Sequence, residues 1–363
     1  MRQLEVYIHI PFCISKCKYC DFLSAPASGE KRQKYVDDLC RKICEWKETV
    51  KEYQVVSIFL GGGTPSILTS EQTGSIFGAL RDTFRISSDA EITTEMNPGT
   101  VTEEKLRVYK KLGINRLSIG LQTADDKELK CLGRIHTYEE FLTTYQMARN
   151  MGFGNINIDL MTAIPHQTME SYENTLKKVV ELNPEHISAY SLIIEEGTPF
   201  YERYGEGRCA EELPDEDTER EMYARTKEIL KEHGYERYEI SNYAKEGYAC
   251  RHNLGYWDRV EYLGIGDGAA SFLDHKRWNQ GEEPAALTEK EEIEEFMFLG
   301  LRKTKGISRK KFLEMFGKEI EIYYGNLLVK LERDQLITVS EDMIALTEKG
   351  IDVSNYVLSQ FLL

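Results

Sequence analysis

Short apolar runs and longer amphipathic stretches alternate along the first half of the chain. The apolar runs predict strands over residues 5–10, 55–60, 91–95, 116–121, 155–160 and 186–193. The stretches between them carry apolar residues at three- and four-residue spacing, which is typical of helices. These predicted helices cover residues 34–47, 70–84, 102–112, 137–151 and 171–182. Because alternating strands and helices favour parallel strands with crossover helices, we predict an α/β fold of six units forming a partial (β/α)6 barrel.

The pattern changes in the second half of the chain. An acidic loop is expected at 202–217, followed by a helix at 219–233 and a strand-like run at 235–243. The segment GEEPAA ending at residue 286 indicates a domain boundary. Beyond it the pattern is mainly helical and ends in a pair of short strands, as in winged-helix modules. We therefore predict two domains, at residues 1–285 and 286–363.

Polar residues stand where the predicted strands end. They are His9, Gly61 to Gly63, Glu95, Gln122 and Asp159. In βα barrels, the carboxyl ends of the strands carry the chemistry. Any one of these residues could be polar simply because it meets solvent, but five in succession favour a functional site.

Composition and charge restrict the class of partner. The chain of 363 residues is 41% hydrophobic and 29% charged, which is ordinary for a globular protein. No window resembles a membrane-spanning helix, and the first residues lack the features of a signal peptide, so we expect a cytoplasmic protein. A net charge of −15 argues against a nucleic-acid partner and gives no help in binding anionic lipid. The acidic runs at 211–217 and 289–295 are expected to be solvated.

Three cysteines near the start carry the strongest chemical signal. Cys13, Cys17 and Cys20 follow an apolar strand at C-x3-C-x2-C spacing. Three thiolates can hold three irons of a 4Fe–4S cluster, which leaves the fourth iron free for a small molecule. A zinc site would require a fourth ligand, and no second cysteine pair follows at a suitable distance. Eight cysteines in a chain of this length do not suit a disulfide framework.

This cysteine segment resembles the radical SAM enzymes. The resemblance implies that S-adenosylmethionine binds the open iron and that an electron from the cluster cleaves its sulfonium bond. The run from Gly61 to Pro65, GGGTP, is similar to the segment that holds the methionine amino group in that superfamily. Glu95 is placed to accept hydrogen bonds from ribose hydroxyls. Its alternative interpretation is an exposed carboxylate before the turn at residues 97–99.

Six motifs, including these two, make the resemblance specific. YIHIPFC-x3-C-x2-C, GGGTPS, TEMNPGT, RLSIGLQ, LGRIH and NIDLM…IPHQT occur in the order seen in oxygen-independent coproporphyrinogen III oxidases. The resemblance implies that Tyr7, Gly62 and Glu95 contact the S-adenosylmethionine that is cleaved. It also implies a second S-adenosylmethionine position, bordered by Tyr19, Gly63, Thr64, Gln122, Arg134 and Asp159.

Three departures separate the chain from the oxidases themselves. Phe22 stands where the oxidase pattern has a fourth cysteine, and the first predicted strand begins by residue 5 rather than after an extension. The segment from His252 to Trp257, HNLGYW, marks a haem chaperone branch of the same family. In that branch His252 would bind haem iron, while Tyr256 or Trp257 would stack on the porphyrin. The alternative is a partly buried histidine in an aromatic cluster.

The leading hypothesis is therefore a haem chaperone that binds haem, a 4Fe–4S cluster and S-adenosylmethionine. It would pass haem to acceptor proteins, including acceptors at the membrane where it could associate peripherally. A reductant protein for the cluster and a homodimer are also expected. One alternative is an enzyme that decarboxylates coproporphyrinogen III, and another is an iron–sulfur protein with a purely structural cluster. No catalytic residue is assigned.

Overall fold

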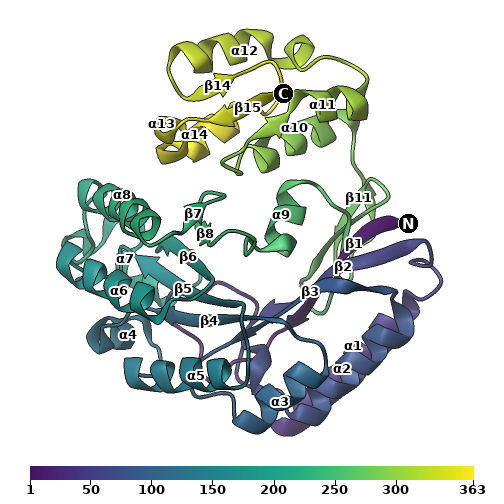
Figure 1. The fold of residues 1–363 in the computed structure, drawn as a ribbon, viewed down its shortest axis with the longest axis vertical. Helices are drawn as coiled ribbons and strands as arrows, with labels where there is room; N and C mark the ends of the chain where they lie inside the picture. Colours follow the sequence, from purple (N-terminus) through teal and green to yellow (C-terminus); the bar gives the residue numbers. More distant parts are fainter.

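A curved twelve-stranded sheet forms the body of the protein, whose computed structural model describes residues 1–363 (Figure 1). Its central strands are β1 (Arg2–Ile10), β2 (Tyr53–Gly62), β3 (Ile86–Met96), β4 (Arg116–Gln122), β5 (Ile156–Thr162) and β6 (His186–Ser191). Each pairs in parallel with the next one along the chain. The connecting helices are α1 (Gly29–Glu45), α2 (Ser70–Thr83), α3 (Glu103–Lys111), α4 (Asp126–Leu132), α5 (Tyr138–Asn150) and α6 (Met169–Leu182). The predicted partial barrel is confirmed, and α4 is an element that the sequence pattern did not indicate.

Side-chain caps fix where the barrel helices begin. Thr69 before α2 and Thr137 before α5 each accept a hydrogen bond from the backbone three residues ahead. In both cases a Gln or Glu side chain at that position returns a bond to the cap, forming a capping box. These contacts satisfy backbone N–H groups that have no partner within the helix. The starts predicted at 70 and 137 are accordingly correct to within one residue.

The two faces of the central strands differ in chemistry. In β1, Leu4, Val6 and Ile8 are fully buried among the 50 residues of the main hydrophobic core. At the alternate positions, Glu5 and His9 are polar and almost fully buried, and Tyr7 is partly buried. Because successive strand side chains point to opposite faces, the apolar set meets the helices and the polar set enters the barrel. The interior of the barrel is therefore a polar environment shielded from water.

The sheet is extended on both sides by elements from the middle of the chain. These are α7 (Pro199–Tyr204), α8 (Glu216–Glu232), β7 (Glu236–Arg237), β8 (Asn242–Ala244), α9 (Arg251–Trp257), β9 (Tyr262–Ile265), β10 (Ala270–Leu273), β11 (Lys276–Asn279) and β12 (Ala285–Ala286), with 3₁₀ turns at Pro65–Ile67, Gly205–Gly207 and Ala210–Glu212. β9 pairs in parallel with β1, whereas β8 pairs antiparallel with β6. The single strand expected at 235–243 is wrong, because β7 and β8 form an antiparallel pair there.

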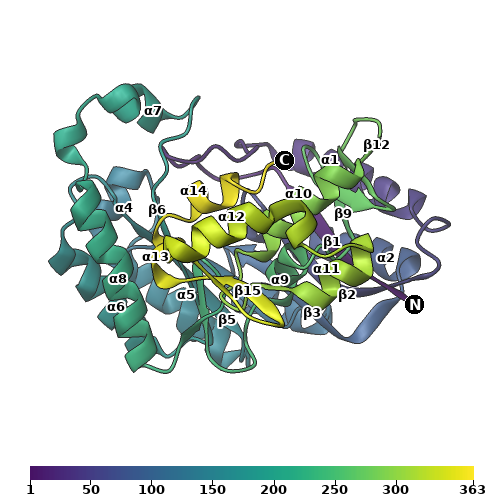
Figure 2. The same cartoon turned by 90° about the horizontal axis from the view of Figure 1, so that it is seen from above.

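The last fifth of the chain forms a second module with its own core. It contains α10 (Glu289–Gly300), β13 (Ile307–Ser308), α11 (Arg309–Phe316), α12 (Glu321–Arg333), β14 (Ile337–Val339), β15 (Met343–Leu346), α13 (Glu348–Asp352) and α14 (Ser354–Ser359). Its small sheet has the order β13-β15-β14, and its 18 buried apolar residues run from Ile293 to Phe361. Helices with a small hairpin confirm the winged-helix-like prediction, but the hairpin does not end the chain as predicted, because α13 and α14 follow it. Figures 1 and 2 show this module and α9 on the concave side of the sheet, while α1 to α6 lie on its convex side.

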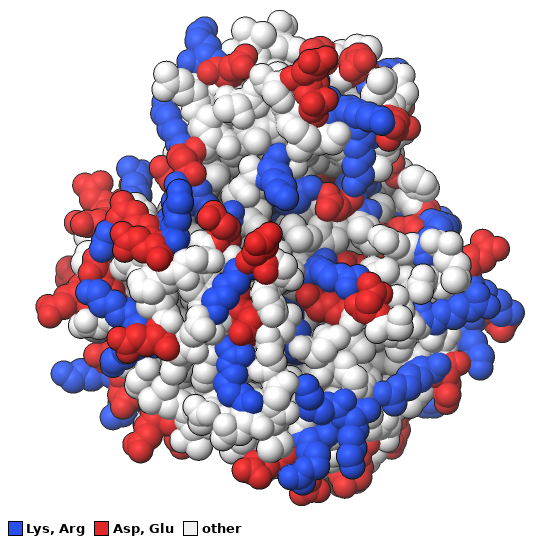
Figure 3. Space-filling view, viewed as in Figure 1, with Lys and Arg blue, Asp and Glu red and all other residues white.

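Charged residues of both signs are mixed on the surface. Figure 3 shows acidic side chains gathered toward the side of α6 and α8, and basic side chains gathered toward the side of α1 to α3. The expectation that residues 289–295 are solvated is wrong for Glu295. Its carboxylate is buried and forms ion pairs with Arg259 and Arg277. No helix is both long enough and apolar enough to cross a bilayer.

Candidate functional site

Two adjoining cavities open on the concave side of the barrel. The first, of about 550 Å³, is named here the aromatic cavity after Tyr7, Phe59, Tyr256, Trp257, Tyr262 and Phe272 in its wall. The second, of about 470 Å³, is named the cysteine cavity because Cys13, Cys17 and Cys20 line it. Phe22, Gly62 and Glu95 line both cavities. A ligand in one cavity would therefore lie next to a ligand in the other.

The structure distributes all the predicted site residues between these cavities. Tyr7 and His252 belong to the aromatic cavity. The cysteine cavity contains the three cysteines together with Tyr19, Gly63, Thr64, Gln122, Arg134 and Asp159. Most residues of the cysteine cavity come from the loop after β1 and from β2, β4 and β5, as expected for a βα barrel, whereas Arg134 follows α4.

The cysteine loop is held by backbone hydrogen bonds to two parts of the fold. The Cys13 amide donates to the Ala25 carbonyl at 3.2 Å, which closes the loop on itself. The Lys18 amide donates to the Leu132 carbonyl at 3.0 Å, which ties the loop to the end of α4. All eight cysteines are free thiols, and the three in this loop are partly exposed. Burial raises the pKa of the Cys20 thiol, an effect that a bound metal would reverse.

The cysteine sulfurs receive hydrogen bonds from two predicted site residues. Thr64 Oγ1 donates to Cys13 Sγ at 3.4 Å, and Arg134 Nη1 donates to Cys17 Sγ at 3.7 Å. Such donors stabilise metal-bound thiolates and tune a cluster's potential. No group of three His, Cys, Asp or Glu side chains converges on one point that could hold a single metal ion. In a 4Fe–4S cube each thiolate binds a different iron, so this donor set fits a cluster rather than a single zinc ion.

Asn97, which the sequence interpretation did not select, connects these donors. Its Oδ1 accepts from Arg134 Nη2 at 2.7 Å, and its Nδ2 donates to Thr64 Oγ1 at 2.9 Å. Arg134 Nη2 also donates to the Gly120 carbonyl at 2.6 Å. The signal for Asn97 lay in the TEMNPGT motif, where it was interpreted only as part of a turn. Asn97 fixes both sulfur donors in one network.

Two carboxyl groups lie deep in the cysteine cavity. Glu95 Oε2 accepts from the Gly62 amide at 3.1 Å, and burial together with Asp159 raises the pKa of Glu95 to about 8. Asp159 accepts from Asn157 Nδ2 at 2.7 Å and from Ser118 Oγ at 3.3 Å, while burial raises its pKa as well. A bound cation would favour the ionised form of both groups. The cavity thus suits a cationic ligand with hydroxyl groups.

The glycine run allows close packing of neighbouring residues as well as close approach of a ligand. Gly62 has φ +107°, and a Cβ there would lie 2.5 Å from the His9 ring. A Cβ at Gly63 would lie 2.6 Å from the Phe12 carbonyl oxygen. The sequence interpretation attributed these glycines to close approach of a ligand. The structure shows that the cysteine loop and His9 already require them.

His9 joins the aromatic cavity to the cysteine loop. The Leu23 carbonyl can only accept, so His9 Nε2 carries the proton in the 2.9 Å contact between them. In the neutral ring Nδ1 then accepts from the Tyr7 hydroxyl at 3.0 Å. His9 thereby orients Tyr7 and fastens the loop that carries Phe22, a role that was missed although His9 was noted at a strand end.

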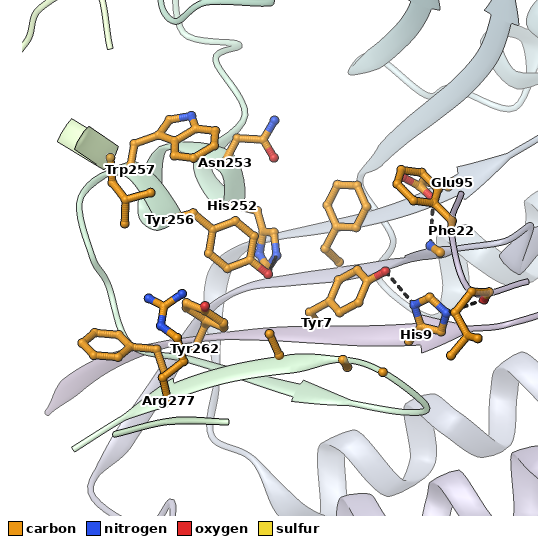
Figure 4. Close-up of a pocket in the computed structure, with 18 of the residues that line it drawn as sticks. Tyr7, His9, Phe22, Glu95, His252, Asn253, Tyr256, Trp257, Tyr262 and Arg277 are labelled. Carbon is orange, nitrogen blue, oxygen red and sulfur yellow. Dashed lines mark hydrogen bonds between the residues drawn. The ribbon is translucent and has the colours of Figure 1, made fainter. Parts of the chain in front are cut away.

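His252 is buried at the floor of the aromatic cavity, with only 2% of its side chain exposed (Figure 4). Ser57 Oγ donates to Glu5 Oε1 at 3.0 Å, so it accepts from His252 Nδ1, 2.8 Å away. The other nitrogen, Nε2, therefore accepts from the Tyr256 hydroxyl at 3.1 Å. Burial, and secondarily Arg116, lowers the pKa of His252 to about 3, which keeps the ring neutral. A neutral imidazole with a defined Nε2 lone pair is the form that binds iron.

The sequence interpretation did not select Glu5, which is connected to His252 through Ser57. A carboxylate flanked by Leu4 and Val6 in an apolar strand was the available signal, because such a position is buried. The ring of His252 also stacks on Phe59, with 5.2 Å between centroids and 27° between planes. The histidine thus lies in an aromatic cluster, as its alternative interpretation held, and it also lines a cavity large enough for a ligand.

Comparison with known proteins agrees with this geometry. Residues 7–179 match the radical SAM superfamily, and residues 287–353 match the HemN C-terminal domain. The chain is 37% identical to the heme chaperone HemW of Bacillus subtilis over 99% of both chains. It is 35% identical to the heme chaperone HemW of Lactococcus lactis, over 99% of this chain and 97% of that one.

A solved structure shares the fold. The radical SAM enzyme coproporphyrinogen III oxidase (HemN) from Escherichia coli superposes with a TM-score of 0.87, at 24% identity, over 99% of this chain and 90% of that one. Identity at this level shows the fold alone. Sequence relatives that align over nearly their full length show the family, and the chain belongs to the HemW family of heme chaperones within the radical SAM superfamily.

Proposed function

We propose that the protein binds haem in the aromatic cavity and passes it to acceptor proteins. The observation that carries this proposal is the position of His252, a neutral histidine at the floor of a 550 Å³ cavity lined by aromatic rings. Ligand cavities of this kind are mostly apolar with a few placed polar groups. Nε2 is the nitrogen that would face the iron, because Nδ1 is committed to Ser57. The Tyr256 hydroxyl would then give up its bond to Nε2.

The adjoining cysteine cavity would hold the cofactors of the radical SAM superfamily. Members of that superfamily bind a 4Fe–4S cluster and S-adenosylmethionine, and the cluster supplies an electron to its ligand when bound. We propose that Cys13, Cys17 and Cys20 hold the cluster, with Thr64 and Arg134 donating to the sulfurs. Glu95 and Asp159 would face the cationic, hydroxyl-bearing ligand.

Several parts of the hypothesis stay predictions. Membrane-associated acceptors, peripheral binding of the protein itself, a reductant protein and a homodimer each require a direct binding experiment. A net charge of −15 favours docking to a protein acceptor over docking to anionic lipid. We also propose a division of the chain at residue 286, supported by the two separate hydrophobic cores.

An anaerobic haem titration of the cluster-reconstituted protein tests the proposal. Wild type should bind one haem per chain, and His252→Ala should lose that binding or change its absorption spectrum. Ser57→Ala should keep the stoichiometry but weaken affinity, because the ring would lose its orientation. Absence of stoichiometric binding by wild type, together with conversion of coproporphyrinogen III, would instead support the decarboxylase alternative.

A further inference from the structure

A buried guanidinium group in the aromatic cavity lacks hydrogen-bond partners at two of its three nitrogens, the third donating weakly to Met315 Sδ at 3.9 Å. Arg259 follows α9, and only 4% of its side chain is exposed. Its Nη2 is buried without any partner. Its Nε lies 3.3 Å from Glu295 Oε2, but the two atoms are not aligned for a hydrogen bond. A buried donor left without a partner is costly and uncommon in folded proteins.

A second arginine lies beside it. Arg277 on β11 donates from Nη2 to Glu295 Oε2 at 3.0 Å, and 37% of its side chain is exposed. Both guanidinium groups lie over the ring of Phe272, at 4.9 Å for Arg259 and 5.6 Å for Arg277. Glu295 is the only carboxylate paired with either arginine. Two cations thus share one anion in an apolar wall.

The surrounding charges do not compensate for this excess. Burial lowers the pKa of Arg259 below its ordinary value, against the opposing effect of Glu295 and Glu292. Glu292 is already bonded to His275 Nδ1, and Asp267, which also lines the cavity, pairs with Lys42. The local environment therefore favours an additional anion next to Arg259.

The position of the pair matches one end of a long ligand. Figure 4 shows Arg277 and Tyr262 at one end of the aromatic cavity, and Glu95 with Phe22 at the other. A ligand with an apolar body and carboxylates on one edge would place its rings among the aromatic residues and its acids at the arginines. Guanidinium groups bind carboxylates through two parallel hydrogen bonds.

We infer that Arg259, assisted by Arg277, binds the propionate carboxylates of a porphyrin held in the aromatic cavity. This inference rests on the proposed function, because it assigns a residue role within the same cavity. It also orients the ligand, with the propionate edge toward β11 and the opposite edge toward Phe22 and the cysteine cavity. Both residues would be binding residues rather than catalytic ones.

The alternative to a binding role for the two arginines is a purely structural role. Glu295 belongs to α10 of the second module, whereas Arg277 belongs to the large sheet. The two arginines could simply fasten that module to the barrel. This role would make no distinction between a porphyrin with free carboxylates and one with esterified carboxylates.

The experiment therefore compares two ligands as well as two proteins. Wild type and Arg259→Gln are titrated with haem and with haem dimethyl ester, and binding is followed by the porphyrin absorbance. Wild type should prefer haem by about ten- to a hundredfold, since charge-assisted hydrogen bonds to an ester are lost. Arg259→Gln should weaken haem binding by a similar factor and leave ester binding within about threefold. Arg309→Gln, which removes an ion-paired arginine outside the cavity, should match wild type.

The outcomes separate this inference from the proposed function. Equal weakening of both ligands by Arg259→Gln, or no preference by wild type, would overturn the propionate assignment while leaving haem binding intact. Failure of wild type to bind either ligand would overturn the proposed function. The ester comparison on wild type needs no variant, so it remains decisive if Arg259→Gln does not fold.

Discussion

The two cavities are built in different ways. The cysteine cavity consists of short segments at the carboxyl ends of neighbouring strands, and each segment is a recognisable run such as the cysteine loop or GGGTP. The aromatic cavity combines one such run, HNLGYW, with residues from distant parts of the chain, from Tyr7 in β1 to Leu299 in α10. Its wall includes α9 and the strands that extend the sheet.

This difference in construction implies a difference in tolerance. Binding in the cysteine cavity depends on a few sulfur and polar atoms in a connected network. The loss of one cysteine should therefore remove the cluster. The aromatic cavity depends on many apolar surfaces, each of which contributes a modest part of the binding free energy. Apart from His252 and Arg259, which we propose bind the polar groups of the ligand, its most sensitive points should be the residues that position α9.

The largest expected effect distinguishes binding in the cysteine cavity from binding in the aromatic cavity. Replacing Cys13, Cys17 or Cys20 by Ala should abolish the cluster. The loop offers only three thiolates to a cluster that is normally held by four, so none of the three can be lost. Haem affinity should stay within about threefold of wild type, since none of the three lines the aromatic cavity. Iron and acid-labile sulfide analysis, followed by haem titration, measures both. Cys209→Ala, at an exposed position, is the control; parallel loss of haem binding would show that the cavities are coupled.

The next largest effect concerns the packing of α9 against β1. A Cβ at Gly255 would lie 2.0 Å from Glu5 Oε1, so Gly255→Ala should displace the helix and reduce the free energy of unfolding by about 3 kcal/mol. Haem affinity should fall with it, because α9 carries His252. Gly74→Ala in α2 meets nothing within 4 Å and should instead stabilise by roughly 0.5–1 kcal/mol. Urea titrations measure the free energy of unfolding of both variants. Equal values would refute the close packing of α9 against Glu5.

Glu5 should make stability depend on pH. Burial raises its pKa to about 9 from 4.5, with Glu91 and Asp258 adding to the rise and Ser57 and Arg251 opposing it. The folded state therefore keeps a proton that the unfolded state releases. Its contribution to stability is complete below pH 4.5 and is lost as pH rises toward 9.

Glu5→Gln should remove this dependence. Between pH 7 and 8.5, wild type should lose about 2 kcal/mol more than the variant, because Glu95, whose pKa is also raised, titrates in both proteins alike. Urea unfolding at the two pH values measures the difference. Ser188→Ala, which alters another polar residue of the sheet, should keep the wild-type slope. Identical slopes for wild type and Glu5→Gln would mean that Glu5 is ionised in the folded protein.

The same contrast explains how far sequence alone could lead. The six central strands and most of the helices between them were predictable, because they depend on local pattern and spacing. The cysteine loop was predictable for the same reason, whereas most other residues of the cysteine cavity were identified through the family resemblance, and Asn97 was missed. The pairing of β9 with β1 and the folding of α9 onto Glu5 were not, since they join residues some 250 positions apart. Glu295 shows the limit most clearly. Within an acidic run it was expected to be solvated, but tertiary packing places it between two arginines.

Phe22 is the residue at which the two cavities meet, and it stands where the oxidase pattern has a fourth cysteine. It lines both cavities, yet 61% of it is exposed. An aromatic ring that remains largely in solvent contributes less than a fully buried one. With ligands bound in both cavities, the ring would therefore separate them more than anchor either of them.

Phe22→Ala should accordingly give the smallest effect, about a threefold loss of affinity for both haem and S-adenosylmethionine. Leu23→Ala is the matched control, because Leu23 is similarly exposed but lines only the aromatic cavity. It should weaken haem binding alone. Both affinities come from separate titrations of the same preparations. A loss of haem affinity alone in Phe22→Ala would assign the residue to the aromatic cavity, and a loss greater than tenfold would mean that the ring closes over the porphyrin when haem is bound.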